Sequence, residues 1–380
     1  MGSKILVGNN IEKLKEIESE SVDCIVSSPP YFGLRDYGTG TWEGGDPNCP
    51  HKRLTKISKD TATGHAGMYE QGHVVGDAIY KQTCPECGAK RIDEQFGLEE
   101  TLEEYIEKTV LLFEELRRVL KPQGTVWWNI GDSYANKSSA WGGRGKNSIL
   151  NETGLEDKQR RNTVVPDGLK AKDLMMIPSR VAIALSENGW YLRSEIIWHK
   201  PNPMPESVKD RPTSAHEKIY LFAKNKKYYY DADAIRVPQK QDSIARAGRD
   251  VWKNNKIDTG NYSIPNVDSA KKLNQKVRDT VAEGKIPMAN KRNVWTVTTK
   301  PFRGAHFAVF PPDLIEPCIK AGCPKGGTVL DPFGGSGTTG LVANNLGRNA
   351  ILIELNEEYV KIAKKRLGED LGLFSEVKDG

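Results

Sequence analysis

The sequence predicts an α/β protein whose core is a doubly wound, mostly parallel sheet. Short apolar runs alternate along the chain with stretches of helical periodicity, a pattern typical of parallel strands covered by helices. The apolar run 22–26 leads into Ser27-Ser28-Pro29-Pro30-Tyr31, and the run 327–330 leads into the glycine-rich stretch 331–340. Because ligands bind beyond the carboxyl ends of parallel strands, we expect Ser28 and Gly335 to lie across a single cleft.

The individual elements follow from the apolar periodicity. The expected strands cover residues 5–7, 22–26, 125–130, 190–198, 218–222, 327–330 and 350–354. The expected helices cover residues 11–17, 102–120, 174–185 and 312–320, a stretch after Gly340, and residues 357–367. The helix 102–120 ends at Lys121-Pro122-Gln123-Gly124, which is a turn signal.

Three stretches interrupt this alternation: residues 38–92, 133–171 and 239–291. Irregular stretches of this length are uncommon unless they carry a function or form small units of their own. In residues 239–291, eleven Lys or Arg accompany six Asp or Glu, a local balance of +5 in a chain whose whole net charge is +5. This concentration favours a surface that meets phosphates, although a solvated basic loop has the same composition.

Length and composition limit the class of protein. The 380 residues are enough to bury a substantial core in one large domain with insertions or in two to three units. The sequence has no run of about 18 apolar residues and no charged-then-apolar leader, so we expect a soluble, non-secreted protein with no membrane partner. Its six cysteines do not resemble a secreted disulfide framework in a chain of this length.

The glycine-rich stretch Gly335-Ser336-Gly337-Thr338-Thr339-Gly340 matches the dinucleotide fingerprint G-x-G-x-x-G. Its glycines allow a tight turn and a close backbone approach, and Glu354, at the end of the next strand, can accept hydrogen bonds from ribose hydroxyls. Only about forty residues follow, too few to complete a six-stranded nicotinamide domain downstream. No Gly-Lys-Ser/Thr follows the glycines, so the loop is not a phosphate-binding P-loop.

The loop Ser28-Pro29-Pro30-Tyr31 suits an amino group on a flat heterocycle. Its prolines fix φ and remove backbone donors, which leaves carbonyls to accept from a substrate, while Ser28 adds a hydroxyl and Tyr31 a flat face for stacking. An exocyclic base amine is a poor nucleophile because its lone pair is delocalised into the ring. Acceptors around its N–H bonds favour the tetrahedral, nucleophilic form and stabilise the developing positive charge. A strand that simply ends in a rigid proline turn is the structural alternative.

Taken in order along the chain, these motifs resemble those of the amino-methylating, S-adenosylmethionine-dependent DNA methyltransferases. The order is the β-type one, in which the catalytic motif precedes the target-recognition region and the cofactor loop comes last. The resemblance covers most of the catalytic fold and rests on residues 7–10, 23, 28–31, 117–124, 128–134, 190–203, 216–217, 224, 306–311 and 331–338. It implies a class I methyltransferase fold, Rossmann-like but with permuted motif order, and a cytoplasmic enzyme of prokaryotic or phage origin.

The resemblance also implies roles for individual residues. The catalytic loop would be Ser28, Pro29, Pro30 and Tyr31. The cofactor's methionine part would be cradled by Asp331, Phe333, Gly335, Ser336, Gly337 and Thr338, its ribose bound by Glu354, and the pocket closed with the help of His306 and Phe310. Asn9 stands near the adenine of the cofactor, where the family usually has an acid, and its side-chain oxygen can still accept. The target base would flip out of the duplex, stack on Tyr31 and donate its amino hydrogens to Ser28 and the Pro29 carbonyl.

The target amine depends on position 28. In this family Ser-Pro-Pro-Tyr is typical of cytosine N4 methylation, whereas Asp-Pro-Pro-Tyr is typical of adenine N6. The sequence therefore favours a site-specific enzyme acting on cytosine N4 in double-stranded DNA, with adenine N6 as the alternative. A cognate restriction endonuclease is a candidate partner, and the sequence does not assign an oligomeric state. A nicotinamide-dependent oxidoreductase and a non-catalytic DNA-binding module are the alternatives from other classes.

The first insertion carries a metal-binding signal. In Cys84-Pro85-Glu86-Cys87 two thiolates can converge on one metal, and Cys49-Pro50-His51 can supply the other two ligands of a tetrahedral, structural zinc site. His65 and His73 are rival ligands, and reduced thiols in a cytosolic loop are the alternative. His51 is followed by Lys52-Arg53 and not by x-Glu, which disfavours a catalytic zinc deaminase.

The third insertion interleaves basic side chains for phosphates with aromatic ones for stacking or wedging: Arg246, Arg249, Trp252, Lys253, Lys256 and Tyr262. Its place matches the family's target-recognition region, and Arg144 with Lys146 is a second candidate DNA contact. A mobile connecting loop is the alternative. We therefore divide the chain into catalytic-domain parts at 1–38, 92–238 and 292–380, the last binding the cofactor, a zinc-knuckle insertion at 39–91 and a target-recognition region at 239–291.

Overall fold

The computed structural model describes residues 2–33, 39–49, 51, 83–84, 86–99, 101–135, 168–248, 267–299, 310–371 and 377–379. The chain divides into two compact units, Met1–Tyr229 with Asn293–Gly380, and Tyr230–Arg292. The first unit contains the central sheet, and the described residues of the second form two helices and a two-stranded ribbon.

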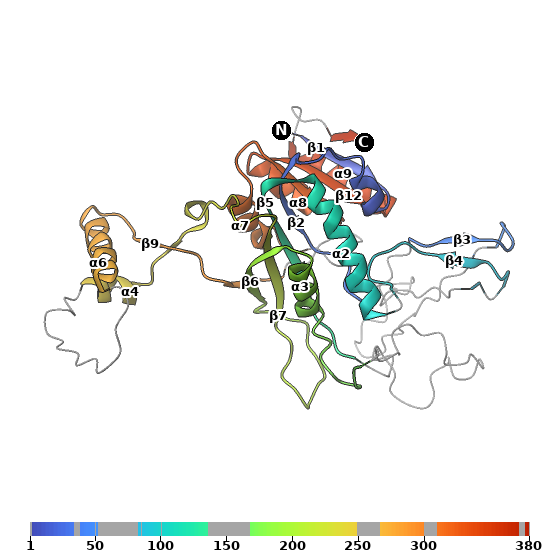
Figure 1. Cartoon of the computed structure of the whole chain (residues 1–380), viewed down its shortest axis with the longest axis horizontal. Helices are drawn as coiled ribbons and strands as arrows, with labels where there is room; N and C mark the ends of the chain where they lie inside the picture. Colours follow the sequence, from blue (N-terminus) through green and yellow to red (C-terminus); the bar gives the residue numbers. More distant parts are fainter. Residues whose placement is uncertain are drawn as a thin grey trace, which may run out of the picture. The chain divides into compact units, whose positions relative to one another are not determined.

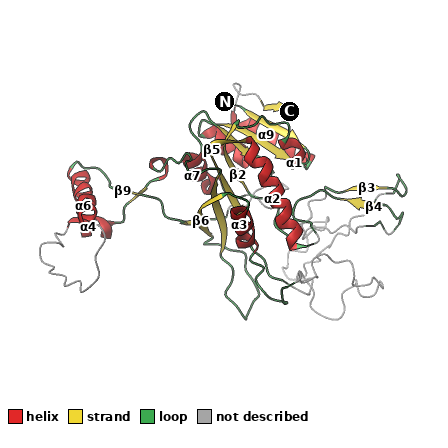
Figure 2. Cartoon of the chain, in the orientation of Figure 1, coloured by secondary structure: helices red, strands yellow, loops and turns green. Residues whose placement is uncertain are grey.

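A nine-stranded sheet forms the centre of the first unit (Figure 1, Figure 2). In spatial order its strands are β10 (Val294–Thr296), β6 (Tyr191–His199), β7 (His216–Ala223), β5 (Leu120–Ile130), β2 (Val22–Ser27), β11 (Thr328–Asp331), β12 (Asn349–Glu354), β1 (Ser3–Val7) and β13 (Val377–Asp379). Neighbours are parallel except at β7, which is antiparallel to both β5 and β6. The prediction of an α/β fold with a mostly parallel sheet is confirmed.

Helices cover both faces of this sheet. They are α1 (Asn10–Leu14), α2 (Leu102–Val119), α3 (Ile177–Glu187), α7 (Pro312–Gly322), α8 (Thr338–Asn345) and α9 (Glu357–Leu371). In β5, Trp128 packs against Phe113 of α2 with ring centroids 4.9 Å apart, whereas the next side chain, Trp127, faces α7, where a Cβ on Gly322 would meet its Nε1 at 2.5 Å. Because successive strand residues point to opposite faces, α2 and α7 cover opposite sides, and the sheet is doubly wound as predicted.

Helix α2 shows why the predicted helices form where they do. Its N-cap Thr101 accepts a hydrogen bond from the Glu104 backbone N–H at 3.1 Å, and the Glu104 carboxylate accepts from the Thr101 backbone N–H at 3.3 Å. This capping box satisfies two donors that the first turn leaves without intrahelical partners. Tyr105 and Phe113, two of the apolar residues at helical spacing, are fully buried in the core. Local capping and amphipathic spacing therefore act together.

The expected turn at residues 121–124 is the main correction to the predicted elements. The structure extends β5 through this stretch to Leu120, but the pairing with β2 jumps from Val22 opposite Leu120 to Cys24 opposite Thr125. Residues 121–124 thus form an irregular bulge within the strand, and the turn signal marks that irregularity. The prediction failed because a bulge and a turn share the same Pro and Gly residues.

Smaller differences concern short elements. Helix α8 begins at Thr338, before the Gly340 start that we expected, because Gly337 already serves as its N-cap with φ +81°. The edge strands β10 and β13 were not expected, since three residues carry too little periodicity to be seen in a sequence. Among the described residues, none of the helices combines the length and the apolar character needed to cross a bilayer.

Within the described residues, helices or strands appear in the first and third of the interrupting stretches. In the first, β3 (Thr41–Glu43) and β4 (Lys90–Ile92) pair as an antiparallel hairpin. The second compact unit contains α4 (Gln241–Gly248), α6 (Val267–Ala282), a 3₁₀ turn at Asp233–Ile235, and the paired strands β8 (Val237–Pro238) and β9 (Met288–Ala289). Helices α4 and α6 pack together around the buried Ala247 and Val277. The expected recognition region, residues 239–291, lies within this unit.

Candidate active site

A cleft of about 350 Å³ opens at the carboxyl ends of the central parallel strands. The residues that follow β1, β2, β11 and β12 line it, and so do the end of β6 and the beginning of β7. Strand β7 runs antiparallel to its neighbours, so its amino end lies at the same edge as their carboxyl ends. Ser28 and Gly335 both line this cleft, as expected. The fold therefore brings the two terminal motifs to one place.

The glycine-rich wall is held mainly through its backbone. The Gly335 N–H donates to Glu354 Oε2 at 2.7 Å, and the Asn356 N–H donates to Glu354 Oε1 at 2.8 Å. Gly335 has φ +49° and Gly337 has φ +81°, both in the region that only glycine adopts readily. A Cβ on Gly337 would also lie 3.1 Å from the Ala363 Cβ of α9. The loop thus requires glycine at these positions, and α8 starts directly from it.

Asp331 joins the two walls at their base. Its side chain is 2% exposed, and Oδ1 accepts from the Ser27 hydroxyl at 2.5 Å and from the Phe333 N–H at 3.0 Å. Oδ2 accepts from the Thr339 hydroxyl at 2.6 Å. Burial raises the pKa of the Asp331 carboxyl to about 7, although these three donors oppose the shift. Asp331 therefore ties the ends of β2 and β11 together and organises the start of the glycine-rich loop.

The remaining predicted cofactor residues of the described chain surround this loop. Burial raises the pKa of Glu354, and the two backbone donors leave lone pairs on its oxygens for a further ligand. Arg366 of α9 donates to the Ser336 hydroxyl at 3.2 Å and to the Thr338 hydroxyl at 2.8 Å, which braces the loop from behind. Asn9 Oδ1 caps α1 by accepting from the Ile11 N–H at 3.0 Å. Part of the acceptor capacity that we expected of Asn9 is thus used by its own helix.

The opposite wall is held by side chains from distant elements. The Tyr31 hydroxyl donates to Glu217 Oε2 at 2.7 Å, and the Ser28 hydroxyl donates to the Tyr31 oxygen at 3.4 Å. The Tyr105 hydroxyl of α2 donates to the Pro30 carbonyl at 3.2 Å. A Cβ on Gly131 would meet the Tyr31 ring at 2.6 Å, so glycine there makes room for the ring. Burial, with the nearby Glu217 charge, raises the pKa of Tyr31 well above its usual value and keeps the phenol protonated.

Three residues at this wall, Asn129, Lys200 and Glu217, were assigned no individual role by the sequence analysis. Glu217 pairs with Lys200, and the Lys200 ammonium lies 4.3 Å from the centre of the Trp198 ring. Asn129 donates to Glu217 Oε2 at 3.3 Å and to the Lys218 carbonyl at 3.1 Å. Lys200 and Glu217 stand within motifs that signalled the family, but nothing in their spacing indicates that the end of β6 and the start of β7 meet Tyr31. Glu94 and Phe96 also line the cleft, and no sequence motif indicated that they belong to the site.

The structure brings most of the predicted site residues together. The cleft is lined by Asn9, Ser28, Pro29, Pro30, Tyr31, Phe310, Asp331, Phe333, Gly335, Ser336, Thr338 and Glu354. Gly337 lies beside this lining as the N-cap of α8, and His306 lies outside the described residues.

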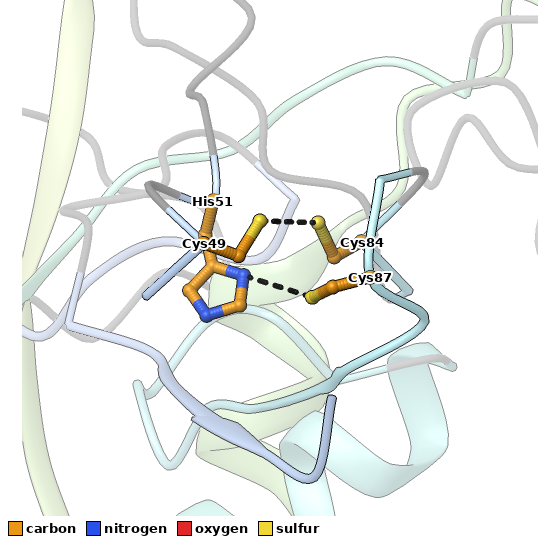
Figure 3. A group of neighbouring side chains, drawn as sticks. All are labelled: Cys49, His51, Cys84 and Cys87. Atoms are coloured by element: carbon orange, nitrogen blue, oxygen red, sulfur yellow. Dashed lines mark hydrogen bonds between the residues drawn. The ribbon is translucent and has the colours of Figure 1, made fainter. Parts of the chain in front are cut away.

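The predicted metal ligands form a cluster apart from the residues that line the cleft, and one of the predicted DNA contacts is among the described residues. Cys49, His51, Cys84 and Cys87 form one cluster, whose ligand atoms are all within 4.8 Å of one another (Figure 3). Arg246 is exposed on α4 of the second unit. The other predicted residues fall outside the described ranges: the DNA contacts Arg144, Lys146, Arg249, Trp252, Lys253, Lys256 and Tyr262, and the rival metal ligands His65 and His73.

Comparison with known proteins gives consistent results. A family model described as DNA methylase (N6_N4_Mtase) matches residues 22–365. The type II methyltransferase M.SmaI of Serratia marcescens is 37% identical over 369 residues, which cover 96% of this chain and 90% of that protein. The type II methyltransferase M.Cfr9I of Citrobacter freundii is 38% identical over 374 residues, which cover 98% and 90%. These matches span both walls of the cleft.

A solved structure supports the fold independently of close sequence similarity. The PvuII DNA methyltransferase, described as cytosine-N4-specific, is 17% identical to this chain and superposes with a TM-score of 0.53. The match covers 97% of this chain and 87% of that one. At this identity the likeness concerns the arrangement of the sheet and helices.

Proposed function

The chain belongs to the DNA methylase family, and we propose that it transfers a methyl group from S-adenosylmethionine to the exocyclic N4 amine of a flipped cytosine in double-stranded DNA. Membership of this family sets aside the nicotinamide-dependent oxidoreductase and the non-catalytic DNA-binding module. The observation that carries the proposal is the single cleft lined by Ser28 and Gly335, with a glycine-rich loop on one wall and an amine-accepting loop on the other.

The glycine-rich wall fits the cofactor. S-adenosylmethionine supplies an electrophilic methyl group on a sulfonium. Glu354, whose oxygens keep lone pairs beside their two backbone donors, accepts from the ribose hydroxyls. The loop from Phe333 to Thr338 approaches the methionine part closely because its glycines carry no side chain. Phe310, which lines the cleft, helps to close the pocket.

The Ser-Pro-Pro-Tyr wall receives the target amine. The Pro30 carbonyl already accepts from Tyr105, so we assign the amine to the Ser28 hydroxyl oxygen and the Pro29 carbonyl. These acceptors draw the N–H bonds out of the base plane and make the nitrogen lone pair available to the methyl group. Tyr31 stacks on the flipped base, and its hydroxyl is held by Glu217. The protein thereby contributes orientation and charge placement to a direct, in-line transfer.

We assign the DNA contacts to the second compact unit and, as a second contact, to the polar stretch near residue 144. Arg246 is exposed on α4, and Lys272 and Lys276 are exposed on α6. Basic side chains on one small unit suit contacts with phosphates, which position a duplex. Arg144, Lys146, Arg249, Trp252, Lys253 and Lys256 complete the proposed contacts.

The decisive experiment identifies the modified base. The protein is incubated with S-adenosylmethionine and unmethylated genomic DNA, and the digested nucleosides are separated by mass spectrometry. We expect N4-methylcytosine, and sequencing then gives its context. Adenine N6 is the alternative target, and N6-methyladenine in its place would overturn the cytosine assignment. DNA without either modified base, from protein shown by calorimetry to bind the cofactor, would overturn the proposed activity itself.

A further inference from the structure

We propose that Cys49, His51, Cys84 and Cys87 bind one structural zinc ion, and that this ion stabilises the wall of the cleft formed by residues 93–97. The four side chains converge from two segments, one after β3 and one before β4 (Figure 3). Neither the metal nor its effect on the cleft is needed for the methyl transfer chemistry proposed above. The metal assignment therefore stands apart from the proposed function, whereas the effect on the cleft is measured through the proposed cofactor.

The distances within the cluster match a tetrahedral site. The sulfurs of Cys49 and Cys84 are 3.7 Å apart, and the Cys87 sulfur lies 3.6 Å from His51 Nδ1. A tetrahedron with zinc–sulfur bonds of about 2.3 Å has sulfur–sulfur edges of about 3.8 Å, and a sulfur–nitrogen edge is slightly shorter. A disulfide would need sulfurs about 2.05 Å apart. Both distances thus fit ligands that share one metal, and the Cys49 and Cys84 sulfurs are too far apart for a disulfide.

The surrounding backbone is adapted to this convergence. Gly45 has φ +72°, and a Cβ there would lie 2.8 Å from the Cys87 sulfur, so a side chain would push the two segments apart. His51 has φ +39°, a left-handed conformation that costs free energy in a non-glycine residue and persists only where the surroundings impose it. The His51 ring stacks on Trp42 with centroids 4.5 Å apart, which fixes its orientation.

The ligand set indicates zinc in a structural role. Three cysteines and one histidine are a common structural zinc set, and soft thiolates with imidazole disfavour Mg²⁺ and Ca²⁺. Four protein ligands close the coordination sphere and leave no position for a substrate or a reactive water.

The hairpin β3–β4 is too short to be stable alone, so a metal that links its two strands would stabilise it. Each of its strands has three residues, and an isolated two-stranded hairpin is only marginally stable in water. At its other end the hairpin is tied by the Thr39 hydroxyl, which donates to Asp93 Oδ1 at 3.0 Å, and the Asp93 carboxylate is itself held by a buried ion pair with Arg91. A metal at the cluster would close the hairpin at the opposite end, so that both ends are held.

The hairpin leads directly into the cleft wall. Glu94, Gln95 and Phe96 follow β4 and line the cleft. Phe96 is buried between Tyr105 and Phe333, with ring centroids 5.1 and 5.2 Å away. The next residue, Gly97, lies so close to the catalytic loop that a Cβ on it would meet the Tyr31 carbonyl at 2.9 Å. Loss of the metal should therefore loosen this wall and weaken cofactor binding.

Metal analysis and a pair of cysteine variants test the proposal on the full chain. Elemental mass spectrometry of protein purified without chelator should give about one zinc per chain. Cys84→Ser should lose the zinc, lower the melting temperature and raise the Kd for S-adenosylmethionine several-fold. Cys318→Ser is the matched control, because its buried sulfur donates to the Leu314 carbonyl at 3.6 Å, far along the chain from the cluster, and a serine hydroxyl can replace that bond.

Each part of the proposal can fail separately. Undamaged protein without zinc, or with iron in its place, would overturn the metal assignment. Zinc loss in Cys84→Ser with unchanged Kd for the cofactor would overturn the coupling to the cleft wall. Addition of a chelator to the wild type is a second route to the same state, and we expect it to lower the melting temperature as the variant does. None of these measurements requires methyl transfer, so the proposed activity is tested independently.

A different observation, the hydrogen-bonded series from Ser28 through Tyr31 to Glu217, carries a second inference, which rests on the proposed function. We infer that Glu217 is the final acceptor of the proton that the amine loses. Each donor in the series points toward Glu217: the Ser28 hydroxyl toward the Tyr31 oxygen, and the Tyr31 hydroxyl toward Glu217 Oε2. Lys200 forms an ion pair with the same carboxylate.

The proton transfer balances without any further reactant. The amine nitrogen forms a bond to the methyl carbon as the sulfur–carbon bond breaks, and the nitrogen becomes positively charged. It passes one proton to the Ser28 oxygen, the Ser28 proton moves to the Tyr31 oxygen, and the Tyr31 proton moves to Glu217 Oε2. Glu217, whose side chain is 18% exposed, then releases the proton to water.

Glu217→Gln keeps the shape and the hydrogen bond from Tyr31 but cannot take up a proton. We expect its kcat to fall about 100-fold, with the Kd for S-adenosylmethionine unchanged and with a changed solvent isotope effect on kcat. Glu217→Asp should recover part of the rate, and Glu195→Gln, a carboxylate bound to Lys218 and Tyr220 away from the cleft, is the control. Wild-type kcat in Glu217→Gln, or equal losses in the Gln and Asp variants, would overturn the relay. An inactive wild type would instead point to failure of the proposed function.

Discussion

The two walls of the cleft are held in place by different kinds of contact. The glycine-rich wall is held by backbone donors and by Glu354, which lies only 19 positions from Gly335. The Ser-Pro-Pro-Tyr wall is held by side chains of Tyr105, Asn129 and Glu217, which lie 75 to 186 positions from their partners. The first wall therefore depends on local conformation, and the second depends on the assembly of the whole sheet. Asp331 and Thr339 cross between the walls, because they belong to the local wall but bond to Ser27 and to the Val26 carbonyl of β2.

The largest expected effect comes from a change in the Ser-Pro-Pro-Tyr wall that leaves the glycine-rich wall intact. Tyr31→Ala removes the stacking face and the bond to Glu217, and we expect methyl transfer to fall at least about 100-fold through misplacement of the base. Cofactor affinity should stay unchanged, because the opposite wall is held by its own contacts. Transfer of a radiolabelled methyl group and calorimetric titration measure the two effects. A wild-type transfer rate in this variant would remove the catalytic assignment of the loop.

The second prediction concerns the residue that links the walls. The pKa of Asp331 is about 7 in the folded protein and about 3.9 in an unfolded chain, so between these values the folded state retains a proton that the unfolded state has lost. The contribution of Asp331 to the free energy of unfolding should therefore fall as pH rises from about 4 to 7, by up to about 1.4 kcal/mol per pH unit.

Urea denaturation across this pH range tests the role of Asp331. Asp331→Asn should make the free energy of unfolding depend less on pH, because the amide does not titrate. Asp242→Asn, a change of an exposed residue on α4 of the other unit, should leave the slope as in the wild type. An unchanged slope in Asp331→Asn would mean that other groups produce it.

The third prediction concerns the local wall. Gly337→Ala forces an alanine to adopt φ +81°, which costs about 1–2 kcal/mol and brings a methyl group against Ala363. Since the strain falls on the cofactor loop, we expect the Kd for S-adenosylmethionine to rise about tenfold. The matched control is Gly368→Ala in α9, where a Cβ meets open space. That change should leave the Kd unaltered and stabilise the protein by about 0.5–1 kcal/mol.

The smallest effect tests the remote support of the other wall. Tyr105→Phe removes the donor to the Pro30 carbonyl but keeps the ring packing against Phe96. A typical hydrogen bond contributes about 1 kcal/mol, so kcat should fall a few-fold with cofactor affinity unchanged. Steady-state kinetics on an unmethylated duplex measure this. A change in the Kd for the cofactor with constant kcat would show that α2 supports the glycine-rich wall instead.

Comparing sequence and structure shows which features local pattern could predict. The strand before Asp331, the glycine loop and Glu354 lie within 30 residues, and their spacing alone indicated how they meet. The grouping of Cys49, His51, Cys84 and Cys87 followed from the same kind of reasoning, because paired ligands at short spacing can bind one metal. The bulge in β5 and the three-residue strands escaped prediction, since short or irregular elements carry no clear period.

The sequence by itself determined the family, the α/β sheet and the two motifs that meet in the cleft. These features rest on buried apolar runs and on residues whose backbone or chemistry is unusual, and both are visible one segment at a time. Only the tertiary structure decided that Glu217 and Lys200 stand behind Tyr31, that Asp331 bonds across to Ser27, and that the hairpin with the cysteine cluster leads into the cleft wall. Such contacts depend on strand order and on the antiparallel direction of β7, which set the distance between segments that no local pattern connects.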